Sequence, residues 1–265
     1  MLADSHCHLD CLDLKNYNGD INQALVAARL KDVQYILSPG ISLETFPRVL
    51  KIVEDDPKLF AALGVHPVDK GVRQPSLEEL LILGQSKKVV GIGETGMDFY
   101  YATHEIDRQR QRELFRLHIQ AARELNKPLI IHVRDAGQEI IKILKEEHGE
   151  NIGGVIHCFT GSKDLAFEAI KLGFYISISG IITFHKAESL REIVKSLPLE
   201  KVLIETDAPF LAPVPVRDKP NEPKYLPYIA EFISKLRKIS YESFANIVTD
   251  NFLQLWRSSV SLCSL

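Results

Sequence analysis

The chain has 265 residues, of which 45% are hydrophobic and 25% are charged, and its formal net charge is −3. This length suffices for one large core, and the charge excludes a protein that holds polyanions through a general basic field. No apolar stretch is long enough to span a membrane, the start MLADSHCHLD lacks the features of a signal peptide, and the cysteines show no C-x-x-C spacing. We therefore expect a cytoplasmic protein without membrane association.

Short runs rich in Val, Ile and Leu alternate along the chain with longer segments of helical periodicity. The eight apolar runs predict strands at 2–8, 33–40, 59–67, 89–96, 128–135, 153–161, 174–180 and 201–209. Helices are expected near 20–31, 44–55, 76–86, 105–126, 137–148, 163–172, 188–196, 226–238 and 241–256.

Eight successive βα units predict an α/β fold, a TIM-type (β/α)8 barrel. The apolar runs are nearly continuous, which is typical of parallel strands that are buried on both faces. A doubly wound open sheet is the competing fold, but it usually carries a glycine-rich phosphate-binding turn after the first strand. This chain has SHCHLD at that position.

No repeat, low-complexity segment or linker divides the chain. We expect a single domain over 1–258, followed by a short C-terminal tail at 259–265. The proline-rich segment 209–223 is interpreted as a long loop beside a site, because the helical residues after it are too few for a second core.

Histidines and carboxylates stand where the predicted strands end. His6 and His8 close the first run, and residues two apart in a strand point to the same face. Barrel active sites are built at the carboxyl ends of several strands, so we expect metal ligands to converge there. The candidate ligands are His6, His8, Glu94, His132, His157 and Asp207.

Four imidazoles and two carboxylates exceed the needs of one tetrahedral zinc, but they suit two divalent ions that share a carboxylate. Nitrogen and oxygen donors without thiolate favour Mg, Mn or Zn. The hypothesis assigns one ion to His6, His8 and Asp207 and the other to His132 and His157, with Glu94 between them.

Further side chains near the strand ends are candidates for catalysis and substrate binding. Asp207 could accept a proton from a metal-activated water, and Glu205 could fix an imidazole tautomer. His66, in GVHP, and Arg134, in HVRD, are predicted to bind substrate phosphate. The alternatives are a hydrogen bond to a loop carbonyl for His66, and a salt bridge with Asp135 or another acid at the rim for Arg134.

Three aromatic residues after the strands, Tyr100, Tyr101 and Phe210, could stack on bases, but we favour the interpretation that they cap the core. Asp98 is expected to fix a loop rather than to bind metal. Strand alternation predicts that Cys158 turns away from the site and serves in packing.

In this order and spacing, the motifs resemble the TatD family of metal-dependent deoxyribonucleases, within the amidohydrolase-like superfamily. The resemblance runs through DSHCHLD, GVHP, GIGETGMDFY, IIHVRDA, VIHCFTG and LIETDAPFLAP to the last helices, and it covers almost the whole chain. It implies a TIM-type barrel, two divalent ions and hydrolysis of phosphodiester bonds in DNA, often by 3′ to 5′ exonucleolytic trimming. It also implies that His66 and Glu205 lie near the reacting phosphate.

The leading hypothesis is a two-metal hydrolase acting on DNA ends or single strands, with Asp207, Glu94 and Glu205 as catalytic residues and no obligate protein partner. One alternative is a hydrolase of small-molecule esters, lactones or aminoacyl-tRNA from the same superfamily. Another is a non-catalytic scaffold that keeps its metal for stability. The spare acid Glu205 argues against the scaffold, because a structural site needs no such group.

Overall fold

The computed structural model describes residues 1–68 and 73–257, so the predicted tail at 259–265 lies outside the described residues. The strands are β1 Leu2–Asp4, β2 Val33–Pro39, β3 Leu59–Leu63, β4 Val89–Asp98, β5 Leu129–Arg134, β6 Gly154–Ile156, β7 Tyr175–Ile178 and β8 Val202–Ile204. The α-helices are α1 Ile21–Arg29, α2 Phe46–Val53, α3 Leu77–Gly84, α4 Glu105–Leu125, α5 Gly137–Glu146, α6 Lys163–Lys171, α7 Glu188–Ser196, α8 Leu226–Arg237 and α9 Tyr241–Trp256.

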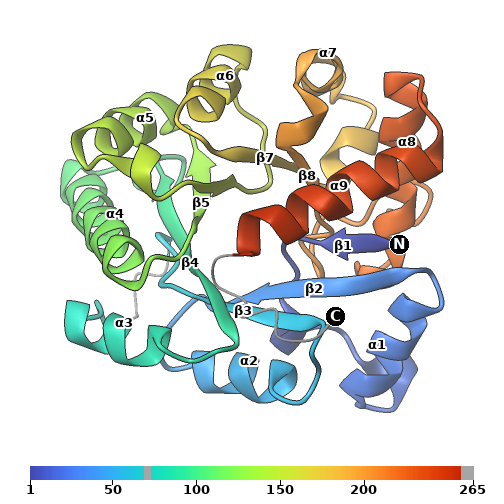
Figure 1. Cartoon of the computed structure of the whole chain (residues 1–265), viewed down its shortest axis with the longest axis horizontal. Coiled ribbons are helices and arrows are strands. Elements are labelled where there is room, and N and C mark those ends of the chain that lie inside the picture. Colours follow the sequence, from blue (N-terminus) through green and yellow to red (C-terminus); the bar gives the residue numbers. More distant parts are fainter. Residues whose placement is uncertain (69–72, 258–265) are drawn as a thin grey trace.

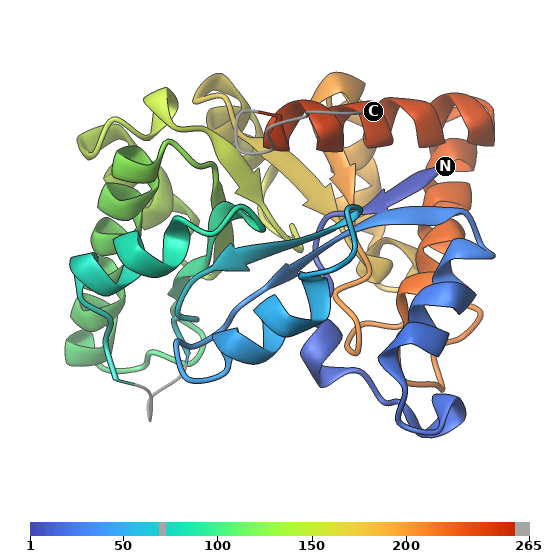
Figure 2. The same ribbon diagram turned by 60° about the horizontal axis from the view of Figure 1, so that its bottom comes forward.

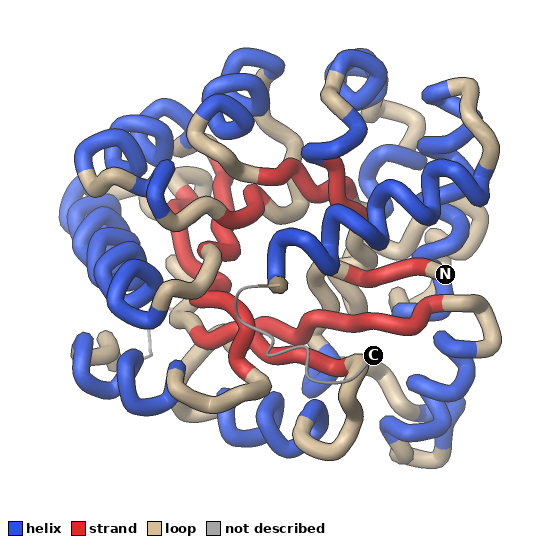
Figure 3. Tube along the Cα trace, viewed as in Figure 1, coloured by secondary structure: helices blue, strands red, loops and turns tan. Residues whose placement is uncertain are grey.

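The strands form a parallel barrel that follows the chain order from β1 to β8. Main-chain hydrogen bonds close the ring just past the strand ends: Ser5 donates to Ile204 O (3.1 Å), and Asp207 donates to His6 O (2.9 Å). The helices surround the strands (Figure 3). The predicted TIM-type barrel is confirmed, and the segment 209–222 is the expected loop.

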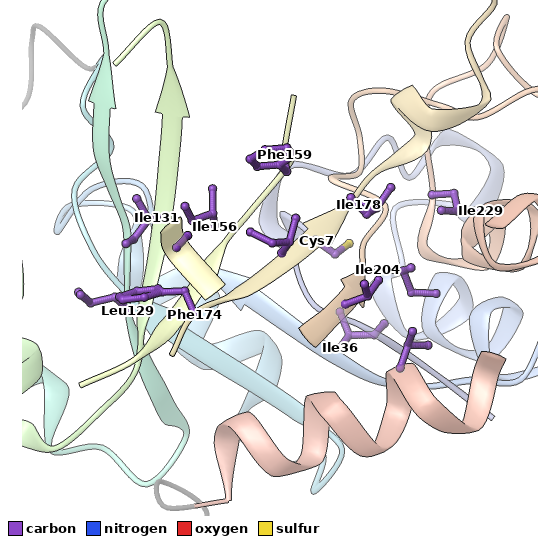
Figure 4. Packing of buried hydrophobic residues seen from close by; sticks show 14 of the residues in the cluster. Cys7, Ile36, Leu129, Ile131, Ile156, Phe159, Phe174, Ile178, Ile204 and Ile229 are labelled. Carbon is purple, nitrogen blue, oxygen red and sulfur yellow. The ribbon is translucent and has the colours of Figure 1, made fainter. Parts of the chain in front are cut away.

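Two apolar layers explain why the strands are hydrophobic on both faces. The larger layer lies between the strands and the helices, and Figure 4 shows part of it, including Cys7 and Phe174. The second layer joins one side chain or more from every strand, and it includes Phe252 and Trp256 of α9. Figures 1 and 2 show α9 lying across one end of the barrel.

The end of the barrel covered by α9 is the amino-terminal end of the strands. Asn251 of α9 donates hydrogen bonds to Leu199 O and Val202 O (both 2.8 Å), at the start of β8. Thr249 donates to Met1 O (3.0 Å), just before β1. The opposite, carboxyl-terminal end is therefore free to hold the site.

Several strands are shorter than predicted. β1 ends at Asp4, so His6 and His8 lie in the loop that follows it, and strand alternation does not align them as we expected. β6 and β8 likewise end at Ile156 and Ile204, just before their polar residues. The polar residues therefore lie just past the strand ends, in the loops at the carboxyl end of the barrel. Among the described helices, none combines the length and apolar character needed to cross a membrane.

Candidate metal centre

A pocket of about 290 Å³ lies at the carboxyl end of the barrel and brings together side chains that are far apart in the chain. Five of the six predicted metal ligands line it directly, and the sixth, His6, is buried beneath them with its ring stacked on His157 at 3.9 Å. The lining residues are His8, Cys11, Ile41, His66, Glu94, His132, His157, Cys158, Asp207 and Phe210.

Glu94 lies at the centre of the site, and its two carboxylate oxygens face different groups. Oε2 lies 3.3 Å from His6 Nε2 and 3.8 Å from His8 Nε2. Asp207 Oδ1 completes this group, at 3.8 Å from His6 Nε2 and 3.5 Å from His8 Nε2. The donor atoms of His6, His8 and Asp207 lie within 4.8 Å of one another, a spacing that could hold one cation.

The other oxygen of Glu94, Oε1, faces three imidazoles. It lies 2.8 Å from His157 Nε2, 3.1 Å from His132 Nδ1 and 3.2 Å from His66 Nε2. Glu94, His132 and His66 form a second group with ligand spacing. His66, which we assigned only to substrate, therefore lies where it could also bind a cation, and His157 lies 3.4 Å from His132 Nδ1.

Two buried carboxylates lie close to the far nitrogens of these imidazoles. Asp98 Oδ2 lies 3.1 Å from His132 Nε2, and Glu205 Oε1 lies 3.4 Å from His157 Nδ1. Glu205 also accepts the N–H of Cys158. Metal-binding histidines usually direct their second nitrogen to such a carboxylate, which fixes the ring orientation and the tautomer.

The charges of the site are strongly coupled. Burial raises the pKa of Glu94, but the neighbouring imidazoles, His157 and His66 foremost, outweigh it and hold that pKa well below its usual range. Burial lowers the pKa of His157, yet Glu94 and Glu205 together raise it well above the ordinary value. Protons on imidazoles thus balance the carboxylates, and a divalent cation that binds here would displace those protons.

A close approach of two glycines lets Glu94 reach the centre. Gly93 has φ +145°, a conformation that favours glycine, and a Cβ on Gly64 would lie only 2.4 Å from the Gly93 carbonyl carbon. The main chain of β4 can therefore pass directly against the end of β3. The N–H of Glu94 donates to Gly40 O (3.2 Å), which ties it to the end of β2 as well.

Helix α4 supports the site through two buried polar side chains. Gln111 Oε1 accepts the N–H of Asp98 (2.9 Å), and its Nε2 donates to Pro67 O (3.1 Å). His118 Nε2 accepts the N–H of Val65 (3.1 Å), next to His66. Sequence reasoning missed Gln111 and treated His118 only as part of the apolar face. The available signal was two polar residues, seven apart, on the buried face of one helix.

Arg134 does not pair with Asp135. Its guanidinium carbon lies 3.9 Å from the ring centre of Tyr100 and 5.3 Å from that of Tyr101, and the described residues include no ion pair with it. Tyr100 and Tyr101 are 55% and 50% exposed, and Phe210 is 56% exposed. The favoured interpretation, that these aromatic residues cap the core, was therefore wrong.

Cys158 also differs from expectation, because it lines the pocket rather than turning away from it. Its φ of +45° breaks the strand alternation on which the prediction depended. Asp98 fixes a loop as expected, since its Oδ1 accepts the N–H of Tyr101 (3.1 Å).

Several known proteins are similar to this chain in sequence. A family model described as TatD related DNase matches residues 3–257. An Escherichia coli protein named as an uncharacterized metal-dependent hydrolase, YcfH, is 41% identical over 260 residues, which cover 98% of this chain and 97% of that protein. A mouse protein named as a candidate deoxyribonuclease is 32% identical over 273 residues, which cover 98% of this chain and 90% of the mouse protein.

A solved structure gives the same result for the fold. The crystal structure of YJJV, a TatD homolog from Escherichia coli, matches with a TM-score of 0.88 at 30% identity, covering 97% of this chain and 98% of that one. With a family model over nearly the whole chain and relatives above 30% identity, the chain belongs to the TatD-related family of metal-dependent hydrolases.

Proposed function

We propose that this protein is a divalent-metal-dependent deoxyribonuclease that cleaves phosphodiester bonds at DNA ends or in single strands, in the 3′ to 5′ direction. The observation that carries the proposal is the position of Glu94 between two groups of nitrogen and oxygen donors. A carboxylate in that position suits a two-metal hydrolase. The DNase description of the family model and the name of the mouse relative support DNA as the substrate.

We infer that two divalent ions, Mg, Mn or Zn, bind at this centre, because the donors are imidazoles and carboxylates. When bound, such ions lower the pKa of a water molecule and neutralise charge on the phosphate. The proposed ligands are His6, His8 and Asp207 for one ion and His132 and His157 for the other, with Glu94 shared.

The side chains of the chain itself supply proton transfer and orientation. Asp207 accepts the proton of the attacking water, since its carboxylate borders the pocket. Glu205, whose Oε1 lies 3.4 Å from His157 Nδ1, orients that ring through its negative charge. His66 lines the same pocket and donates to a phosphate oxygen, and Arg134 binds a phosphate at the rim.

The test follows degradation of 5′-labelled and 3′-labelled oligonucleotides, single-stranded and double-stranded, with each metal. Wild type should shorten the strand from its 3′ end only when a divalent metal is present. Asp207→Asn and His132→Ala should lower kcat by about 10²-fold or more, because each removes a proton acceptor or a ligand. His148→Ala is the matched control, since that histidine is exposed and its ion pair within the described part of the chain, with Glu150, lies outside the pocket.

One result would refute the nuclease. If the purified protein binds metal but leaves every oligonucleotide intact, and Asp207→Asn behaves like wild type, DNA is not the substrate. Turnover of esters, lactones or aminoacyl-tRNA in a parallel screen would then assign the alternative activity.

Metal content tests the two-ion centre independently of substrate. Wild type should bind two equivalents of Mn or Zn per chain, measured by elemental analysis after gel filtration. His8→Ala and His132→Ala should each lose about one equivalent, because they contribute to different donor groups. A wild-type protein that binds a single equivalent would contradict the shared role of Glu94.

A further inference from the structure

An exposed aromatic corner lies beside the metal centre. Tyr100 and Tyr101 follow β4, and their rings stand perpendicular to each other, with an interplanar angle of 89° and centres 5.0 Å apart. Arg134, at the end of β5, lies over the Tyr100 ring at 3.9 Å. The guanidinium thus lies against the face of an aromatic ring, which holds it in place without an ion pair.

The aromatic corner and the metal centre share one anchor. Asp98 is fully buried; its Oδ1 accepts the N–H of Tyr101 (3.1 Å), and its Oδ2 lies 3.1 Å from His132 Nε2. Arg134 lies two residues after His132 on the same strand. The position of the corner is therefore fixed relative to the proposed metal ligands.

The guanidinium of Arg134 has unused binding capacity. Among the described residues it makes no ion pair and no side-chain hydrogen bond, and the side chain is exposed. Arg134 also lines a cavity of about 600 Å³ together with Val133, Thr160 and Ser162. This volume is within the range of small-molecule sites and leaves room for a nucleotide beside the corner.

Resting on the proposed nuclease function, we propose that Tyr100, Tyr101 and Arg134 form a stacking site for one unpaired base of the DNA substrate, next to the cleaved phosphate. Bases stack on aromatic rings and on guanidinium planes when both offer a free face. A base inside a duplex has both faces covered by its neighbours. The site thus favours single-stranded or frayed ends over fully paired ones.

The stacking is tested by measuring kcat/KM for wild type and tyrosine variants on substrates with and without the contacted base. The substrates are a single-stranded oligonucleotide and the same oligonucleotide carrying one abasic residue, placed in turn at each of the last positions before the cleaved end. Tyr101→Leu and Tyr100→Leu should lower kcat/KM on the intact strand by roughly five- to 150-fold, the range of one lost stacking contact. At one abasic position the same variants should show little further loss, because the base that they contact is already absent.

Arg134→Lys separates stacking from charge. The ammonium keeps the positive charge but has no planar face. In this variant kcat/KM should therefore no longer depend on whether the contacted base is present, while the salt dependence of kcat/KM stays close to that of wild type. Tyr228→Leu is the matched control, since Tyr228 is an exposed tyrosine on α8 that does not line the metal pocket. Thermal unfolding of each variant checks that it folds.

The outcomes are distinct. If the tyrosine variants slow intact and abasic strands equally at every position, or Arg134→Lys matches wild type on both, the stacking site is refuted while the nuclease stands. If wild type cleaves neither strand with any metal, the nuclease proposal fails, and the base-stacking site fails with it.

Discussion

At the scale of single residues, His118 shows how a neutral imidazole supports the site from below. It is fully buried, its Nδ1 donates to Leu114 O (2.8 Å), and its Nε2 accepts from Val65 (3.1 Å). Burial lowers the pKa of His118 from the ordinary 6.5 to about 4. Only the neutral ring can accept the hydrogen bond that holds the loop before His66.

The pKa of His118 predicts a loss of stability in mild acid. The unfolded chain takes up this proton near pH 6.5 and the folded chain only near pH 4, so the contribution is complete above the higher value and falls as pH decreases between them. We expect a loss on the order of 3 kcal/mol in the free energy of unfolding over this range. Urea titrations at a series of pH values measure it.

The variant His118→Gln isolates this titration from that of other groups. Because glutamine carries no proton to gain, the variant should be less stable than wild type at neutral pH, and the difference should shrink toward pH 4. A difference that stays constant over the whole range would show that His118 does not titrate as described.

A second buried residue, Gln111, is predicted to contribute more to the free energy of unfolding than the exposed residues of α4. Gln111→Met keeps the shape of the side chain but leaves the N–H of Asp98 without its partner; the carbonyl of Pro67 loses one donor and keeps the hydrogen bond from Arg110 (2.9 Å). Each unsatisfied buried group costs about 1–3 kcal/mol, so we expect a similar loss in unfolding free energy, with weaker metal binding through Asp98. Gln109→Met, on the exposed side of α4, should change stability by less than about 0.5 kcal/mol.

At the scale of elements, the contact between β3 and β4 decides where Glu94 lies. In Gly64→Ala the new methyl would meet main-chain atoms of Gly93 and Glu94, which cannot rotate away. We expect a loss of roughly 1–3 kcal/mol in unfolding free energy and reduced metal content, measured by denaturant titration and elemental analysis. Gly137→Ala is the control, because the three atoms nearest to its methyl would all belong to the flexible side chain of Leu165 rather than to the main chain.

At the scale of the whole molecule, α9 closes the barrel at the end opposite the metal centre. Trp256 is buried, and a Cβ on Gly91 of β4 would lie 2.8 Å from its ring. Trp256→Ala should lower the free energy of unfolding by about 3–5 kcal/mol through the cavity that it leaves. Gln254→Ala, on the exposed face of the same helix, should have little effect.

We further propose that residues 1–258 form one cooperative domain. Thermal unfolding of both wild type and Trp256→Ala should then give a single transition, with metal binding lost in the same step. Two separated transitions, one of them retaining metal, would show that the barrel does not unfold as a unit.

Much of the fold was predictable because its signals are local. Apolar runs bounded by turns and helical periodicity placed every strand and α-helix of the described barrel close to its observed position. The same order predicted that His6, Glu94 and His157 would meet, because carboxyl ends of parallel barrel strands share one rim. What failed was local geometry: β1 ends before His6, and Cys158 leaves the strand conformation.

Patterns that extend over a few residues were enough to predict the barrel, the alternation of its strands and helices, and the residue types that gather at one end. The folded chain was needed to show how Glu94 divides its two oxygens, that Gln111 and His118 support the loops, and that Arg134 lies over the Tyr100 ring. Those contacts join segments far apart in the chain. Their distances are set by closure of the barrel and by packing against α4, which no local pattern encodes.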